Sequence, residues 1–351
     1  MDAKDRDRGR AFIGSFTSAG GRGIVAARVD PDTGALTVTG AVNDVADPSY
    51  LTVRHLHTGP VLYAVSETAP GAVAAYDVAG PVPRPLGAPV TVRADEPTHL
   101  TATHGHLLTA NYGSGSVTVL PLADDGTPRA PSGVMRHEGR GPHPDRQLAP
   151  HAHQVLPDPS GRWVLSVDLG TDSVRVCSFN AQAGELTLHS TTALPPGTGP
   201  RHLVFHPAGH HAYVLGELRP GLTVCRWDAA TGVLEPAQET GLFPDGADAP
   251  ASPSAPAVSR DGRHLWAALR GPDAIAVLAL DETGEHAKPV ASVPCGGHWP
   301  RDLALNPSGT RLYAANERSG DITWFDLDPA TGIPDRAGSL GIPAASSVVF
   351  G

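Results

Sequence analysis

Two sets of polar residues recur along this sequence at positions that could carry chemistry. The first set follows a proline that opens a repeated unit, and the second closes the second β-rich run of that unit. The first set is Ser49, Thr98, His151, Arg201, Ser254, Arg301 and Ala344. The second set is Glu67, Tyr112, Asp168, Glu217, Arg270 and Glu317. Most other repeated positions are apolar, glycine or turn residues, so these two sets are candidates for a functional site.

Four members on consecutive units form the catalytic candidates, and they are His151, Arg201, Glu217 and Arg270. An imidazole can give or take a proton near neutral pH, and a guanidinium suits a bidentate grip of carboxylate or phosphate. A carboxylate among arginines stays ionised and could hold or deprotonate a water. Substrate-binding roles are expected for Arg301, His153 and Glu317. Any single one of these residues could instead have only a structural role. Strand ends are solvated and tolerate charge, and Arg–Glu pairs can simply join neighbouring units.

Other kinds of site lack their sequence signals. The chain has no Gly-x-Ser-x-Gly elbow, no Gly-x-x-x-x-Gly-Lys loop and no Gly-x-Gly-x-x-Gly after a strand. His151 and His153 share a strand face with His143 nearby, and a second histidine cluster spans 202–211, but no cysteine or carboxylate spacing completes a metal set. We therefore expect no metal. The segment 136–147, rich in charge, glycine and proline, is predicted to be a long loop at the channel mouth, either a lid or an insertion.

The elements that position these residues are set by recurring turns. One turn recurs at 158–162, 206–210, 259–263 and 306–310, and a second recurs out of phase at 30–34, 180–184, 228–232, 281–284 and 328–332. Proline presets φ and glycine supplies positive φ, so each is predicted to be a hairpin turn. The units open at Pro48, Pro97, Pro150, Pro200, Pro253 and Pro300. This spacing of about 50 residues indicates an internal repeat.

Each unit reads as four antiparallel strands. In one unit they cover 203–205, 212–215 and 222–227, followed by a weaker fourth. Four strands at this period predict a propeller blade. The N-terminal segment 12–40 has three strands and lacks the opening one, whereas 343–350 copies the opening pattern. The predicted fold is therefore all-β, a seven-bladed β-propeller of four-stranded antiparallel blades, closed by pairing the C-terminal strand with the N-terminal blade.

Composition narrows the class of protein. The 351 residues are 40% apolar, with Gly 40, Pro 35 and a net charge of -10. No Lys/Arg stripe is present, so a nucleic-acid partner is not expected. Three cysteines in apolar runs predict buried thiols in a reducing compartment. We predict no membrane span, a disordered tail over 1–10, a single propeller domain over 11–351, a cytoplasmic location and a monomer.

Three motifs resemble a known family. They are Pro150-His151-Ala152-His153, Gly199-Pro200-Arg201-His202 and Pro300-Arg301-Asp302-Leu303. They are similar to the seven-bladed lactonase family, which contains the propeller-type 6-phosphogluconolactonases and the fungal 3-carboxy-cis,cis-muconate lactonising enzymes. The resemblance covers 12–350. It implies an active site of one His, two Arg and one Glu, matching His151, Arg201, Arg270 and Glu217, and it implies no metal or organic cofactor.

The leading hypothesis is hydrolysis of a small anionic sugar-acid lactone, such as 6-phosphogluconolactone, at the channel mouth. The arginines would hold the anion and the developing oxyanion. Either Glu217 or His151 would activate water, and the sequence does not choose between them. Two alternatives stay open: a carboxymuconate-type cycloisomerase that uses the same groups, and a non-catalytic propeller that binds a ligand or a protein.

Overall fold

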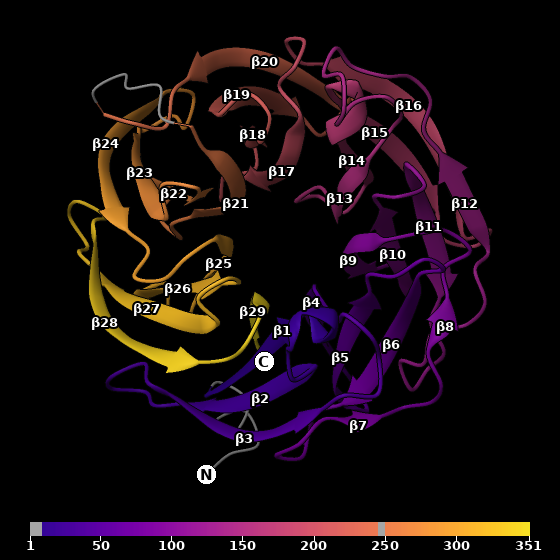
Figure 1. Cartoon of the computed structure of the whole chain (residues 1–351). Helices are drawn as coiled ribbons and strands as arrows, with labels where there is room; N and C mark the ends of the chain where they lie inside the picture. Colours follow the sequence, from indigo (N-terminus) through magenta and orange to yellow (C-terminus); the bar gives the residue numbers. More distant parts are fainter. Residues whose placement is uncertain (1–8, 245–249) are drawn as a thin grey trace.

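Seven antiparallel sheets surround a central axis in the computed structural model, which describes residues 9–244 and 250–351 (Figure 1). The strands nearest the axis are β29, β4, β9, β13, β17, β21 and β25. Each remaining strand of a blade lies farther out, so every blade runs from the axis to the rim. The predicted fold class is confirmed.

The blades are numbered here in chain order. Blade 1 joins β29 (Ala345–Phe350), β1 (Arg10–Ser15), β2 (Ile24–Val29) and β3 (Leu36–Val42). Blade 2 holds β4 (Leu51–Leu56), β5 (Gly59–Ser66), β6 (Ala72–Asp77), β7 (Arg84–Pro85) and β8 (Val90–Thr91). Blade 3 holds β9 (Pro97–Thr103), β10 (His106–Asn111), β11 (Ser116–Pro121) and β12 (Gly133–Arg136). Blade 4 holds β13 (Ala152–Pro157), β14 (Trp163–Asp168), β15 (Ser173–Asn180) and β16 (Glu185–Ala193).

The last three blades are the most regular. Blade 5 holds β17 (Pro200–Phe205), β18 (His211–Gly216), β19 (Gly221–Asp228) and β20 (Val233–Thr240). Blade 6 holds β21 (Ser252–Val258), β22 (His264–Arg270), β23 (Ala274–Leu280) and β24 (Ala287–Pro294). Blade 7 holds β25 (Pro300–Leu305), β26 (Arg311–Asn316), β27 (Asp321–Leu327) and β28 (Pro334–Gly341). Two short 3-10 turns are η1 (Thr17–Ala19) and η2 (Leu169–Thr171).

Positive-φ glycines form the hairpin turns that the sequence predicts. The nine glycines of the two turn elements all have φ between 67° and 78°, a region that costs a side-chain-bearing residue energy. They are Gly34, Gly161, Gly184, Gly209, Gly232, Gly262, Gly284, Gly309 and Gly332. Each donates its backbone N–H back across its own turn, as Gly209 does to the carbonyl of His206 at 2.8 Å. The turn chemistry therefore fixes where each strand ends.

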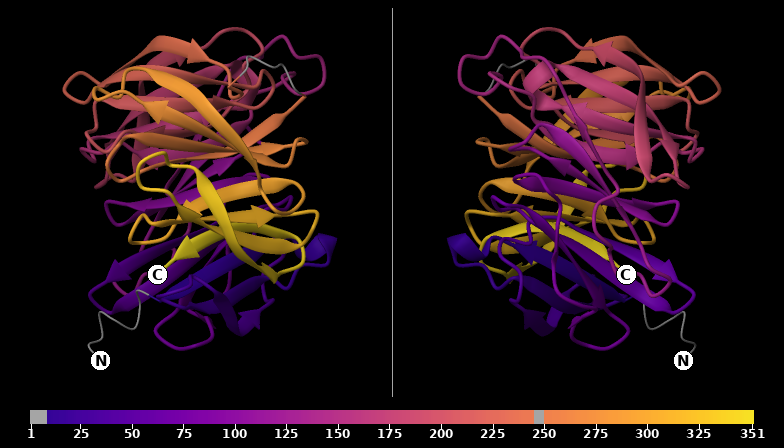
Figure 2. Two further views of the ribbon diagram at one scale, coloured as in Figure 1. Left: turned by 90° about the vertical axis from the view of Figure 1, so that its left-hand side faces the viewer. Right: turned by 90° about the vertical axis from the view of Figure 1, so that its right-hand side faces the viewer.

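Ring closure joins the two ends of the described chain. Phe12 of β1 pairs with Val349 of β29, and Ile13 pairs with Val348 (Figures 1 and 2). This pairing confirms the predicted closure and leaves β1 without a free edge. Strand β1 begins at Arg10, the last residue of the segment 1–10 that the sequence predicts as a tail. The rest of that call, over residues 1–8, lies outside the described residues.

The apolar core is divided into layers between neighbouring blades. Tyr213 of blade 5 packs with Leu265 and Leu269 of blade 6 in one such layer. A buried hydroxyl or indole then joins a blade to a turn carbonyl of the next one. These bonds run from Tyr63 to Gly126, Trp163 to Ala229, Tyr213 to Gly284, Trp266 to Gly332 and Tyr313 to Gly34, at 2.7–2.9 Å. The layers and these bonds hold the ring rigid around its axis.

The three cysteines are buried and unpaired, as the sequence predicts. Burial raises the pKa of the Cys177 and Cys225 thiols to about 12, so both behave as small apolar residues. Over 9–244 and 250–351, no helix has the length and apolar character needed to cross a membrane.

Candidate active site at the ring axis

A β-bulge recurs on the innermost strands of five blades and leaves one residue of each without a pairing partner. In blade 5, Pro200 pairs with Gly216 and His202 pairs with Leu215, so Arg201 is an extra residue without a partner. Bulges of this kind bend a strand and re-aim a side chain. The same register shift occurs at Thr98, His153, Arg301 and Ser346. We call these four residues and Arg201 the bulge ring.

The register of blade 4 corrects one expectation from the sequence. The N–H of Glu217 donates to the carbonyl of Gly199, and the matching bond in blade 4 runs from Leu169 to His151. His151 is therefore equivalent to Gly199, and His153 is the residue equivalent to Arg201. The sequence alignment was wrong here by two residues, because blade 4 has two more residues between its opening proline and its bulge. The same two-residue error applies to blade 1, where Ser346, and not Ala344, is the residue equivalent to Arg201.

Asp168 does not belong to the second polar set, in which the sequence analysis placed it with Glu217. Its carboxylate is buried and accepts from His137 Nδ1 at 2.5 Å, from Arg175 Nη1 at 3.0 Å and from the backbone N–H of His151 at 2.9 Å. Burial alone would raise the pKa of Asp168, but the hydrogen bond from His137 and the other donors lower it. Asp168 therefore acts on the site only by fixing the backbone at His151.

Glu217 is the centre of a cluster of three arginines. Its Oε2 lies 2.8 Å from Arg270 Nη2 and 3.2 Å from Arg201 Nε, and its Oε1 accepts from Arg146 Nη2 at 2.9 Å. The side chain is 5% exposed. Burial would raise the pKa of this carboxyl, but the three guanidiniums outweigh burial and lower it to about 2. Glu217 is therefore ionised throughout the physiological range.

Backbone carbonyls of blade 6 fix the two buried arginines. Arg201 Nη1 donates to the carbonyl of Ser254, and Arg270 donates to the carbonyls of Ser252 and Pro253 at 2.9 and 3.3 Å. Burial lowers the pKa of Arg201 to about 9, and the neighbouring Arg270 charge adds to this effect. Each guanidinium is therefore held from two sides, by Glu217 and by backbone carbonyls.

His151 has a defined tautomer. Its Nδ1 is 2.9 Å from the carbonyl oxygen of Tyr112, and a carbonyl only accepts, so a neutral ring carries its proton on Nδ1. Nε2 then presents a lone pair, and it has no hydrogen-bond partner among the described residues. The ring stacks on Tyr112 with centroids 4.3 Å apart. His151 can therefore accept a proton from a water at Nε2.

Arg146 links Tyr112, on which His151 stacks, to Glu217, and the sequence did not single it out. Its Nη2 lies 3.2 Å from the Tyr112 hydroxyl as well as 2.9 Å from Glu217. It belongs to the predicted loop, which follows β12 on the rim of blade 3 and leads to β13 at the axis. The other blades have shorter rim-to-axis connections, so the length of this one was the available signal. The loop has no counterpart in the repeat, so alignment of the units could not show which of its charges points inward.

The three predicted binding residues are connected through Arg301. Arg301 contacts Glu317 at 3.1 Å and lies 3.7 Å from Glu67, with its guanidinium 4.8 Å from the ring of Phe16. His153 and Arg301 both line a cavity of about 10 Å³, with room for about one water. Burial lowers the pKa of His153 well below its ordinary value, and the Arg201 charge adds to this. A direct role in substrate binding stays a prediction for all three residues.

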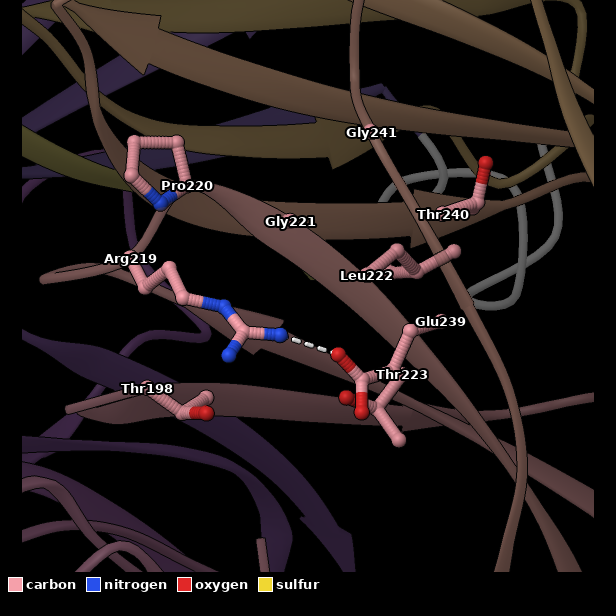
Figure 3. A pocket seen from close by; sticks show the side chains of 9 residues that line it. All are labelled: Thr198, Arg219, Pro220, Gly221, Leu222, Thr223, Glu239, Thr240 and Gly241. Atoms are coloured by element: carbon pink, nitrogen blue, oxygen red, sulfur yellow. Dashed lines mark hydrogen bonds and ion pairs between the residues drawn. The ribbon is translucent and has the colours of Figure 1, made fainter. Parts of the chain in front are cut away.

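A second hollow lies farther from the axis on blade 5 and is shown in Figure 3. The side chains of Arg219 and Glu239 meet across it. Both are about half exposed, and a solvated ion pair of this kind has little pull on a ligand. The buried charges at the axis make the ring centre the stronger candidate.

Comparison with known proteins identifies the family of this chain. Residues 10–350 match the family model described as lactonase, seven-bladed β-propeller. The chain belongs to this lactonase family. It is 31% identical over 330 residues to the 6-phosphogluconolactonase of Bacillus subtilis, covering 92% of each chain. The family assignment supports a lactone hydrolase, and nothing in these relatives supports the cycloisomerase alternative.

Solved structures show the same likeness. A candidate 6-phosphogluconolactonase from Bacteroides fragilis superposes with a TM-score of 0.90 at 29% identity, with 97% of both chains covered. The periplasmic gluconolactonase of Pseudomonas aeruginosa has a TM-score of 0.89 at 28% identity, with 97% of this chain and 98% of that chain covered. Because that neighbour is periplasmic, the cytoplasmic location of this chain stays a prediction.

Proposed function

We propose that this protein hydrolyses the lactone of a phosphorylated sugar acid, with 6-phosphogluconolactone as its substrate, at the mouth of the central channel. The observation that supports this most strongly is the charge at the axis. Three guanidiniums share one carboxylate, which gives the cluster a formal charge of +2 in a chain of net charge -10. Such a cluster attracts an anionic substrate. The name of the Bacillus subtilis relative supports the choice of lactone.

His151 is the proposed general base. Nε2 takes a proton from a water while the water oxygen attacks the lactone carbonyl carbon, and the carbonyl electrons move onto oxygen. When the tetrahedral intermediate collapses, the bond between the acyl carbon and the ring oxygen breaks. The imidazolium returns its proton to that oxygen, so the ring opens to a hydroxy acid and the histidine is restored. Glu217 suits this step poorly, because a pKa of about 2 makes its protonation near pH 7 cost about 7 kcal/mol.

Arg201 and Arg270 are proposed to stabilise the oxyanion. Both contact Glu217 Oε2 and are anchored to backbone carbonyls, and preorganised donors lower a barrier because they need no rearrangement during the reaction. Glu217 holds these two cations side by side, which their mutual repulsion would otherwise oppose. Its role in this proposal is to position the arginines, not to transfer a proton.

The test is the rate of lactone disappearance above the spontaneous rate. The purified protein is given 6-phosphogluconolactone or unphosphorylated gluconolactone, and acid release is followed at constant pH. The wild-type chain is expected to hydrolyse the phosphorylated lactone, and His151→Asn is expected to lower kcat by about 10²- to 10⁴-fold.

The matched control for this variant is His210→Asn, which makes the same change at an exposed turn on blade 5. It is expected to leave kcat at the wild-type value. Wild-type turnover in His151→Asn would remove the general base from the proposal. A wild-type chain without activity on either lactone would refute the proposed function itself.

A further inference from the structure

Arg146 differs from the other arginines of the site in how much of it solvent can reach. Its side chain is 41% exposed, against 5% for Arg201 and 8% for Arg270. Its Nη2 and Nε are used by Glu217 and Tyr112, while Nη1 has no hydrogen-bond partner within the described residues. A guanidinium has five N–H donors, so one side of this one remains available to a ligand.

The backbone beside Arg146 is firmly held although the side chain is not. Gln147 is fully buried, and its Nε2 donates to the carbonyl of Leu169 at 2.8 Å and to Asp172 at 2.7 Å. Its Oε1 accepts from the N–H of His143 at 3.0 Å, which closes the loop on itself. A Cβ at Gly141 would lie 2.4 Å from the Gln147 amide, so this packing requires glycine there. The backbone of the loop is therefore fixed, while the guanidinium of Arg146 can change its position.

Arg146 can exchange its present partners, Glu217 and Tyr112, for a ligand at a small cost in free energy. Glu217 keeps Arg201 and Arg270 when Arg146 leaves it, so its negative charge stays compensated. The bonds from Arg146 to the Tyr112 hydroxyl, at 3.2 and 3.4 Å, are long and neutral on the tyrosine side. A phosphate offers a stronger, charge-assisted and bidentate partner than either group.

We propose that Arg146 is the specificity-determining residue for the anionic group of the substrate, and that it moves from Glu217 to the substrate phosphate on binding. This inference rests on the proposed function for its choice of substrate. Arg201 and Arg270 continue to stabilise the oxyanion, and Arg146 binds the phosphate. The loop that carries it is then a binding element supplied from outside the repeat.

The experiment compares Arg146→Met with Arg140→Met, which removes the same charge from an exposed position in the same loop. Values of kcat and KM are measured for 6-phosphogluconolactone and for unphosphorylated gluconolactone. Arg146→Met is expected to lower the ratio of kcat/KM for phosphorylated over unphosphorylated lactone by about 10- to 100-fold. This change is expected to come from a higher KM for the phosphorylated lactone. Arg140→Met is expected to keep the wild-type ratio. An equal loss on both lactones, or none, would overturn the inference.

A binding measurement separates this inference from the proposed function. Inorganic phosphate is added to each protein and its effect on Tm is recorded. Phosphate is expected to raise Tm for the wild-type chain and for Arg140→Met, and to raise it much less for Arg146→Met. If the wild-type chain hydrolyses neither lactone, the proposed function fails and the phosphate result still decides the role of Arg146. Equal stabilisation of all three proteins by phosphate would refute that role.

Discussion

Glu217 provides the sharpest prediction, because one substitution tests the charge balance of the whole site. Glu217→Gln keeps the shape of the side chain and removes its charge, so it resembles the protonated form of the glutamate. The three arginines around it then lose the anion that they share. Removing one partner of a buried ion pair is costly because the remaining charges stay desolvated.

The magnitude follows from the pKa of Glu217. The difference between an ordinary value of 4.5 and a value of about 2 corresponds to about 3 kcal/mol, since one pKa unit equals about 1.4 kcal/mol. The carboxyl takes up a proton near pH 4.5 in the unfolded chain and near pH 2 in the folded one. Its stabilising contribution is therefore complete above about pH 4.5 and is lost as the pH falls toward 2.

The assay is thermal unfolding of both proteins from pH 7 down to pH 3. A chain of this length has an unfolding entropy of about 0.7 kcal/mol per degree, so 3 kcal/mol lowers Tm by about 4 °C at neutral pH. The matched control is Glu317→Gln at the equivalent position of blade 7. The Glu317 side chain is 23% exposed and pairs with a single arginine, so its loss should cost less than about 1 kcal/mol.

Two results would refute this reasoning. The first is an equal Tm loss in Glu217→Gln and Glu317→Gln, which would mean that burial among three guanidiniums adds nothing. The second is a difference between wild type and Glu217→Gln that does not narrow below about pH 4.5. Turnover of the lactone should also fall in Glu217→Gln, because Arg201 and Arg270 lose their common support.

The remaining predictions concern the ring. Deleting residues 342–351 removes β29 and leaves β1 with an open edge, so size-exclusion chromatography should show aggregation; a soluble, fully active truncation would contradict closure. Tyr213→Phe removes the hydroxyl that bonds the carbonyl of Gly284, which should cost about 1 kcal/mol and lower Tm by about 1–2 °C. An unchanged Tm would show that this joint between blades 5 and 6 carries no stability.

The sequence by itself determined the architecture of this protein. Turn residues act locally: a glycine at Gly209 or Gly232 takes a positive φ because nothing else does so without strain, whatever the rest of the chain does. The period of these turns then gives the number of blades. The strand over 343–350 could be assigned to closure because it completes a pattern that the N-terminus leaves short by one strand.

Part of the site could be predicted from the sequence in the same way. Arg201, Glu217 and Arg270 sit at repeated positions, and the structure brings all three together. His151 is connected to them through Tyr112 and Arg146, although two extra residues in blade 4 put it at a level different from the one expected. A pattern of turns counts units reliably and does not reveal small insertions within one of them.

Only the tertiary structure decided which charges meet. Arg146 lies 71 residues before Glu217 in a loop without a repeat partner, and its contact depends on how the buried Gln147 anchors that loop. The pKa of Glu217, and so its poor fit as a base, depends on three cations delivered by separate segments. Electrostatic coupling acts through distances in space that the order of residues along a chain does not contain.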